Sequence, residues 1–234
     1  KLDNLPDLEK RMLRHGCWYA KPEASGWFKE SWVKVIEPSQ VPLGLKTVRC
    51  YDIAATLPDK EVNKNPDWTR GVKAAYDKET GMFYVLDMVS ERNRPAVIQK
   101  LIEDTAQKDG KSVYIGLPKD PGAGAIEALA NKIARLAKLG FRTLVSKTRK
   151  SKFERAEGFL IAAQNGTVCL VKGDWNKTFI DEWQGYDGTN SRNKKDDIVD
   201  STADCYNHLN NAMFVPTVTY NKTRAQQMKG STLI

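Results

Sequence analysis

Five aspartates in three separate segments of this chain could together bind divalent metal ions. Three form a run near the end of the chain, one lies inside an apolar segment at 48–55, and one follows an apolar segment at 113–117. A carboxylate in a buried strand is costly unless a cation compensates its charge. Oxygen ligands from two strands and a helix suit Mg²⁺ or Mn²⁺, two of which can hydrolyse a phosphodiester. The candidate metal ligands are Asp52, Asp120, Asp196, Asp197 and Asp200.

In this mechanism one ion lowers the pKa of the attacking water and the other stabilises the leaving 3′ oxygen. Asp52 is the residue expected to bridge the two ions. The mechanism requires neither histidine, and we expect structural or surface roles for His15 and His208.

Basic residues flank the predicted acidic site. The formal net charge of the chain is +8, which favours a polyanionic partner but is weak evidence alone. Basic rims around the acids would neutralise backbone phosphates without reading bases. A solvated surface is the alternative for each run taken alone. The DNA-binding candidates are Lys147, Arg149, Lys150, Lys152, Arg155, Lys194 and Lys195.

The sequence argues against a zinc site, a disulfide framework, a membrane span and a signal peptide. The four cysteines are widely spaced without a Cys-x-x-Cys pair, which argues against a zinc site or a disulfide framework. No apolar run approaches the ~18 residues that a membrane span needs, and the first residues do not form a signal peptide. We therefore expect a cytosolic protein that is not secreted and has no membrane partner.

Hydrophobic periodicity predicts an α/β chain that begins with an antiparallel meander. The meander strands are expected at 47–56, 71–77 and 82–90, with a turn at 78–81. Helices and strands then alternate, with helices at 95–108, 124–139, 151–165, 175–184 and 196–212, and strands at 113–117, 141–146 and 167–171. This is the order of a ribonuclease H-like (resolvase/integrase-type) mixed sheet flanked by helices. Many unrelated proteins share that fold, so the order alone does not establish a nuclease.

The chain divides into three parts. Residues 1–45 lack periodicity and carry four prolines among several aromatic residues, so we expect a connector packed on the core. A single-strand-binding platform is the functional alternative for this segment. The predicted catalytic domain is 46–213, and 214–234 is a basic C-terminal tail.

The last predicted helix presents two faces. Apolar residues from Ile198 to Leu209 repeat at helical spacing, and Asp197, Asp200 and Asp204 lie on the face turned away from them. Ordinary helices also carry acids outward, and Asp is a common residue at a helix N-terminus. The helix alone therefore does not establish a metal site, and the case depends on Asp52 and Asp120.

Five segments in a fixed order carry a family resemblance. They are the stretches at 51–56 and 65–72, Asp-Pro-Gly at 120–122, Lys-x-x-Arg-Ala at 152–156 and Asp-Asp-x-x-Asp at 196–200. Over about residues 11–213, the ordered set resembles the C-terminal nuclease domain of large terminase subunits from tailed bacteriophages and prophages.

The resemblance implies a metal-dependent endonuclease that cleaves DNA concatemers during viral genome packaging in the host cytoplasm, with two Mg²⁺ or Mn²⁺ ions. Its implied partners are double-stranded DNA and, in the full-length protein, the packaging ATPase domain, the small terminase subunit and the portal. It implies metal ligands at Asp52, Asp120 and one or more of Asp196, Asp197 and Asp200, with Asp52, Asp120 and Asp197 as the catalytic residues. It also implies Asp67 as an auxiliary acid and Lys152 and Arg155 as contacts to the DNA backbone. For Asp67, a turn-capping role is an equal alternative.

Two departures from the family pattern limit the transfer. Pro118 stands where relatives often carry Glu, so the second carboxylate rests on Asp120 alone. No Walker A sequence is present, so we expect the nuclease half without its motor, and a monomer in solution.

Three other functions share these features. A Holliday-junction resolvase uses a similar carboxylate set but usually needs a stable dimer. A transposase or integrase of the same fold would join strands. A non-catalytic DNA-binding module would show no Mn²⁺-dependent change in cleavage or melting.

Overall fold

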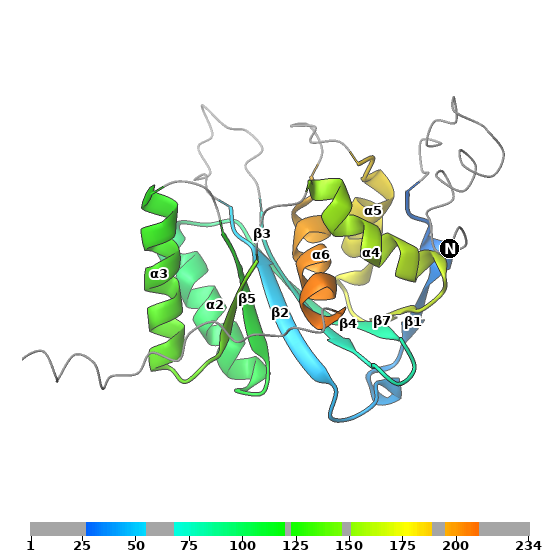
Figure 1. Cartoon of the computed structure of the whole chain (residues 1–234), viewed down its shortest axis with the longest axis horizontal. Helices are drawn as coiled ribbons and strands as arrows, with labels where there is room; N and C mark the ends of the chain where they lie inside the picture. Colours follow the sequence, from blue (N-terminus) through cyan, green and yellow to red (C-terminus); the bar gives the residue numbers. More distant parts are fainter. Residues whose placement is uncertain (1–26, 55–67, 120–122, 147–150, 189–194, 211–234) are drawn as a thin grey trace, which may run out of the picture.

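The computed structural model describes residues 27–54, 68–119, 123–146, 151–188 and 195–210. Within them, the strands form one seven-stranded sheet in the order β1-β7-β4-β3-β2-β5-β6. Helices cover both faces of the sheet (Figure 1). The mixed sheet flanked by helices confirms the predicted fold class.

The centre of the sheet is the predicted antiparallel meander. It consists of β2 (Lys46–Asp52), β3 (Thr69–Tyr76) and β4 (Phe83–Glu91). The β3–β4 turn is closed by the carboxylate of Asp77, which accepts hydrogen bonds from the Glu79 backbone N–H and the Thr80 hydroxyl. Gly81 has a φ of 73° there, a backbone conformation that residues with a side chain disfavour.

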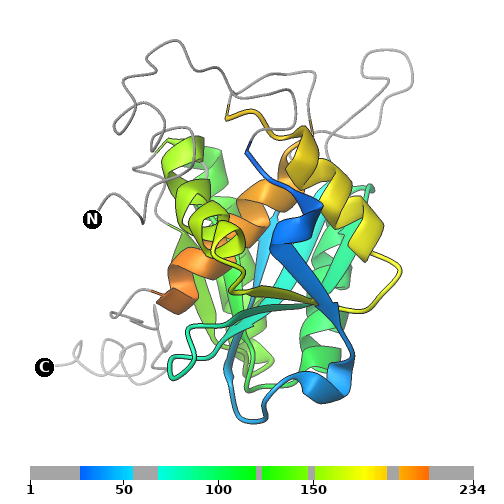
Figure 2. The same cartoon turned by 90° about the vertical axis from the view of Figure 1, so that its right-hand side faces the viewer.

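Parallel strands extend the meander on both sides. β5 (Tyr114–Pro118) pairs with β2, and β6 (Thr143–Ser146) lies beyond it. On the other side, β7 (Val168–Val171) pairs with β4. The edge strand β1 (Val33–Ile36) pairs with β7 and was not expected from the sequence. Figure 2 looks onto this edge of the sheet.

Two short 3₁₀ helices flank β1, namely η2 (Glu30–Trp32) and η3 (Pro38–Gln40). Phe28, just before η2, is fully buried and packs against the rings of Phe159 and Trp183. Residues 27–45 therefore contribute both a strand and core side chains.

Two groups of helices cover the sheet (Figure 1). One face carries α2 (Pro95–Asp109) and α3 (Ala123–Lys138). The other face carries α4 (Lys152–Gln164), α5 (Asn176–Gly185) and α6 (Asp197–Asn210). All five helices lie close to their predicted positions, although α6 is described only as far as Asn210.

The direction of the last side chain of β2 follows from strand alternation. Cys50 belongs to the core under α4, α5 and α6, whereas Tyr51 belongs to the core under α2 and α3. Successive strand residues point to opposite faces. Asp52 therefore points to the face that carries α6.

Close packing fixes α6 against the sheet and against α4. The thiol of Cys205 donates to the Val72 carbonyl on β3, with an S–O distance of 3.2 Å. On the other side, Gly158 of α4 faces the ring of Tyr206. A Cβ at position 158 would lie only 2.7 Å from that ring, so this approach requires glycine.

The structure also describes three of the cysteines and the lengths of the helices. The cysteines within the described ranges, Cys50, Cys169 and Cys205, are buried free thiols. No helix in the described part of the chain combines the length and the apolar character that a membrane crossing needs.

Candidate active site at one edge of the sheet

The strand that carries Asp52 and the strand that precedes Asp120 in the sequence end at the same edge of the sheet. β2 and β5 are parallel, with Cys50 opposite Gly116, so β2 ends at Asp52 where β5 ends at Pro118. Parallel neighbours bring their carboxyl ends to the same edge. Asp120 itself and Asp67 lie outside the described residues, and their roles stay predictions.

Backbone contacts connect Asp52 to the first turn of α6. Asp52 lies opposite Arg70 in the β2–β3 register, and the N–H of Ala54 donates to the Thr69 hydroxyl at 3.1 Å. One residue earlier, the N–H of Trp68 donates to the Asp197 carboxylate at 3.2 Å. The start of β3 therefore links two acids that are far apart in the sequence.

The first turn of α4 brings two cations to the acids of α6. A capping box starts the helix, because Ser151 accepts from the Glu154 N–H and the Glu154 carboxylate accepts from the Ser151 N–H at 2.7 Å. This places Lys152 and Arg155 three residues apart, on the same face of the helix.

The two cations form a network of ion pairs with α6 and the residue before it. The Lys152 ammonium lies 2.7 Å from Asp200 and also contacts Asp196. The Arg155 guanidinium lies 2.7 Å from Asp200 and 3.4 Å from Asp204.

Burial, and for Asp52 also neighbouring carboxylates, disfavour the charged forms of two acids at this site. Burial, followed by the charges of Asp200 and Asp197, raises the pKa of Asp52 well above its usual range, although Lys152 opposes the shift. Burial also raises the pKa of Asp204. A divalent cation would relieve this repulsion.

The aspartates at this edge are suitable ligands for a cation that prefers oxygen, although the described side chains do not surround a single position. The acids at this edge are aspartates, whose oxygens are the ligands that Mg²⁺ and Mn²⁺ prefer. Within the described ranges, no three His, Cys, Asp or Glu side chains stand close enough to hold an ion. Asp120, at the end of β5, lies beyond those ranges.

Glu182 of α5 caps the start of α6. Its carboxylate accepts hydrogen bonds from the Ile198 and Val199 N–H groups. Burial, with a further contribution from Asp197, raises the pKa of Glu182 to about 7, while Arg70 opposes the shift. Glu182 therefore fixes the helix turn that carries Asp197.

We expect Glu182→Gln to stabilise the metal-free protein above neutral pH. Because the folded-state pKa of Glu182 lies above its usual 4.5, the wild type loses stability as the pH rises from 4.5 through about 7. Gln keeps an oxygen acceptor and carries no charge, so the variant avoids a cost of at most about 3 kcal/mol. Urea unfolding in EDTA across this pH range measures the difference. Parallel pH profiles of the two proteins would contradict the assignment.

His208 lies in the last turn of α6 and contacts Ser146 at the end of β6. Its Nε2 and the Ser146 hydroxyl oxygen are 3.1 Å apart, and burial lowers the pKa of His208 to about 4. The imidazole is therefore neutral near pH 7. This placement agrees with the structural role that the sequence predicts for His208.

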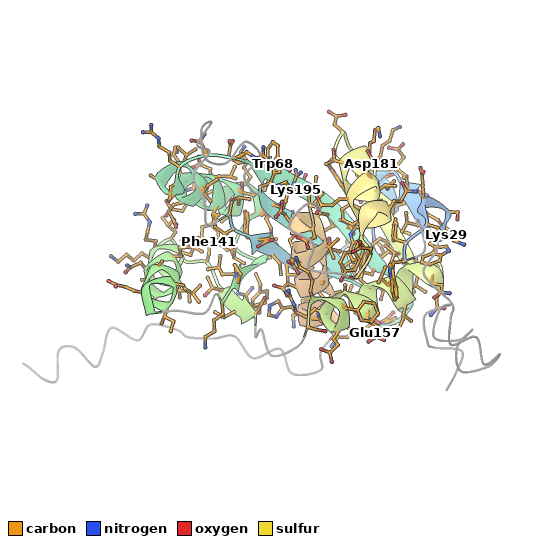
Figure 3. The ribbon with its side chains drawn as sticks, turned by 90° about the horizontal axis from the view of Figure 1, so that it is seen from above. Lys29, Trp68, Phe141, Glu157, Asp181 and Lys195 are labelled. Atoms are coloured by element: carbon orange, nitrogen blue, oxygen red, sulfur yellow. The ribbon has the colours of Figure 1, made fainter. Side chains whose placement is uncertain are left out.

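An aromatic ring held between two guanidinium groups lies beside the acids. The Arg70 and Arg92 guanidiniums lie 4.7 Å and 4.3 Å from the centroid of the Trp68 ring. Figure 3, which looks down on this edge, shows Trp68 and Lys195 near α6. Basic and aromatic groups therefore border the site on the β3 side.

The predicted DNA-binding residues fall into three groups. Lys195 is partly exposed beside the first turn of α6. Lys152 and Arg155 are paired with carboxylates. Their DNA contacts stay predictions, as do those of the residues outside the described ranges, Lys147, Arg149, Lys150 and Lys194.

Sequence reasoning did not assign site roles to Asp204, Glu182, Trp68 or Arg70. For Asp204 a signal existed, since it follows Asp200 by four residues and lies on the same helix face. Glu182 and Trp68 contact the site through backbone N–H groups, which no local pattern reveals.

The sheet order and the helices on its two faces define a domain of the ribonuclease H-like class. The family model for the terminase RNaseH-like domain matches residues 49–209. The chain belongs to this family. The match confirms the resemblance to the nuclease domain of large terminase subunits and the predicted role in DNA cleavage during genome packaging.

Solved structures confirm the fold. The human cytomegalovirus terminase nuclease domain, soaked with Mn and inhibitor-bound, has a TM-score of 0.58 at 10% identity, covering 79% of this chain and 96% of that one. The P22 large terminase nuclease domain has a TM-score of 0.52 at 15% identity, covering 80% and 92%. The Mn-bound nuclease domain of the bacteriophage SPP1 large terminase has a TM-score of 0.52 at 14% identity, covering 75% and 96%. No curated protein sequence matches the chain significantly.

Proposed function

We propose that this domain is a DNA endonuclease that uses two divalent metal ions, bound between the end of β2 and the first turn of α6. The observation that carries the proposal is that the charges of Asp200 and Asp197 act on the buried Asp52, in a chain of the terminase nuclease family. The start of β3 contacts both Asp197 and the segment that follows Asp52. The metal-bound state of the SPP1 and cytomegalovirus domains supports divalent ions as cofactors.

The residues of this chain supply the ligands and their orientation. When bound, Mg²⁺ or Mn²⁺ supplies an activated water and a counter-charge for the leaving oxygen. Asp52, Asp197 and Asp200 would hold the ions, with Asp120 and Asp196 as further ligands. The Trp68 N–H donates to the Asp197 carboxylate and so helps to orient it. Lys195 would approach the DNA backbone at the rim.

The wider biological setting is part of the same proposal. The substrate is double-stranded DNA in the host cytoplasm, and the domain acts as a monomer when separate from its partners. In a full-length large terminase it would work with the packaging ATPase domain, the small terminase subunit and the portal.

A plasmid assay tests the proposal. We expect the domain to nick and degrade supercoiled plasmid with little sequence preference in millimolar Mn²⁺, more slowly in Mg²⁺, and not in EDTA. Mg²⁺ demands stricter octahedral geometry than Mn²⁺, and an isolated domain has no ring to align the DNA. Site-specific cutting of four-way junctions by a stable dimer would contradict the proposal and favour a resolvase. The same plasmid degradation in EDTA would exclude metal dependence.

A further inference from the structure

Lys152 holds the acidic end of α6 together in the metal-free protein. Its ammonium contacts the carboxylates of Asp196 and Asp200 simultaneously. All three side chains are mostly buried, with exposed fractions of 17% for Lys152, 20% for Asp196 and 16% for Asp200. A mostly buried ammonium between two carboxylates occupies the kind of position that a metal cation would take.

The place of Lys152 in its own helix does not explain this arrangement. Lys152 is the first residue of α4, where the helix dipole disfavours a positive charge, and Arg155 lies in the same turn. The compensation comes from α6, whose first turn brings Asp197 and Asp200, with Asp196 directly before it.

The two cations of α4 differ in how firmly they are held. Arg155 divides its guanidinium between Asp200 and the deeper Asp204, and its backbone carbonyl accepts from the Asn207 side chain at 3.0 Å. Within the described residues, Lys152 forms ion pairs only with the two outer acids, Asp196 and Asp200. Lys152 can therefore leave while Arg155 keeps Asp204 in place.

We propose that Lys152 is a placeholder cation, which neutralises Asp196 and Asp200 in the metal-free protein and is displaced from Asp200 when a divalent ion binds. The inference rests on the proposed function, because it concerns the same carboxylates. Metal binding and release of Lys152 are then one exchange of cations. The released ammonium becomes available to a DNA phosphate, which is the contact that the sequence predicts for this residue.

Amine labelling tests the exchange in the wild-type protein. Acetylation by an N-hydroxysuccinimide ester, read by peptide mass spectrometry, measures how accessible each lysine is. We expect Lys152 to react about tenfold faster in Mn²⁺ than in EDTA at matched ionic strength, since ion pairing no longer protects it. Lys177 is an internal control, because its pair with Asp181 is exposed and includes none of these acids. An unchanged rate at Lys152, in a protein that binds Mn²⁺, would overturn the inference.

Calorimetric titration of Mn²⁺ into Lys152→Met gives a second test. Without the competing cation, we expect about tenfold tighter binding than in wild type, which corresponds to about 1.4 kcal/mol. The thermal midpoint of the same variant in EDTA should fall by about 2 to 4 °C, because Asp196 and Asp200 lose a counter-charge. Lys177→Met should change neither quantity. Equal or weaker Mn²⁺ binding by Lys152→Met would mean that Lys152 positions the acids and does not compete for them.

The outcomes separate this inference from the proposed function. If Mn²⁺ binds the wild type and Lys152 reactivity does not change, only the inference fails. If neither the wild type nor Lys152→Met binds Mn²⁺, the proposed metal site fails and the inference fails with it. The labelling experiment needs no variant, so it decides the question even if Lys152→Met does not fold.

Discussion

Replacing Asp52 with Asn is expected to reduce DNA cleavage by about 10³-fold or more while leaving the domain folded. Metal ions supply several kcal/mol of transition-state stabilisation, and each 1.4 kcal/mol corresponds to a factor of ten in rate. Asn has the same size but no charge, so it weakens metal binding without opening a cavity. In EDTA the variant should melt about 2 to 4 °C above wild type, since burial and the charges of Asp200 and Asp197 disfavour an ionised Asp52.

A surface aspartate provides the matched control for this experiment. Asp104 of α2 pairs with Lys100 in an exposed ion pair, on the opposite face of the sheet. We expect Asp104→Asn to cleave plasmid at the wild-type rate and to melt within about 1 °C of wild type. A wild-type cleavage rate in Asp52→Asn would show that Asp52 is not part of the active site.

Replacing Arg49 with Met is expected to destabilise the domain by about 3 to 5 kcal/mol, because it breaks a buried ion pair from one side. Arg49 is 2% exposed, and its Nε lies 2.5 Å from the Asp109 carboxylate. It also lies 2.6 Å from Asp87 and donates to the Gly71 carbonyl at 2.9 Å. Asp109 is the last residue of α2, where the helix dipole disfavours a negative charge. After the loss of Arg49 its remaining ion-pair partner in the described part of the chain is Lys73, at 3.0 Å.

An ion pair with an exposed arginine provides the comparison for this loss of stability. Arg135 of α3 contacts Glu103 of α2 at 2.6 Å, but the arginine side chain is 59% exposed. Such pairs contribute little because water solvates the exposed arginine, so Arg135→Met should cost less than about 1 kcal/mol. Urea unfolding of both variants gives the comparison. Equal losses of stability would show that burial of Arg49 does not increase its contribution.

Most of the fold could be predicted because the periodic spacing of apolar residues identifies long helices and strands well. The meander from β2 to β4 and the helices α2 to α6 were expected within a few residues of their observed bounds. β1 was not expected, because it has four residues and Val33 is the only one that is buried. A short edge strand shows no alternation that a sequence pattern can detect, and its pairing with β7 is a tertiary contact.

The site could be predicted in part. Asp52 attracts notice because a charge inside an apolar strand needs compensation. The acids of α6 were expected on a face turned away from the core, yet Asp197 and Asp204 are only 5% and 7% exposed. The reason is that α6 packs against β2 and β3 on one side and α4 on another, which periodicity within one helix does not reveal.

The pairing of charges was the least predictable feature. Lys152 and Arg155 were expected to contact DNA because they belong to a basic run. In the folded domain they contact the acids of α6, which the sequence places far along the chain. Composition identifies charged residues, but only the packing of α4 on α6 determines their partners.

The most direct test of the metal site is anomalous diffraction at the manganese edge from crystals of the domain soaked in Mn²⁺. We expect two anomalous peaks between the end of β2 and the first turn of α6. Asp52 should ligate at least one ion together with Asp197 or Asp200, and both peaks should weaken or vanish in Asp52→Asn. Manganese bound only at other acids, with the Asp52 carboxylate uncoordinated, would contradict the account.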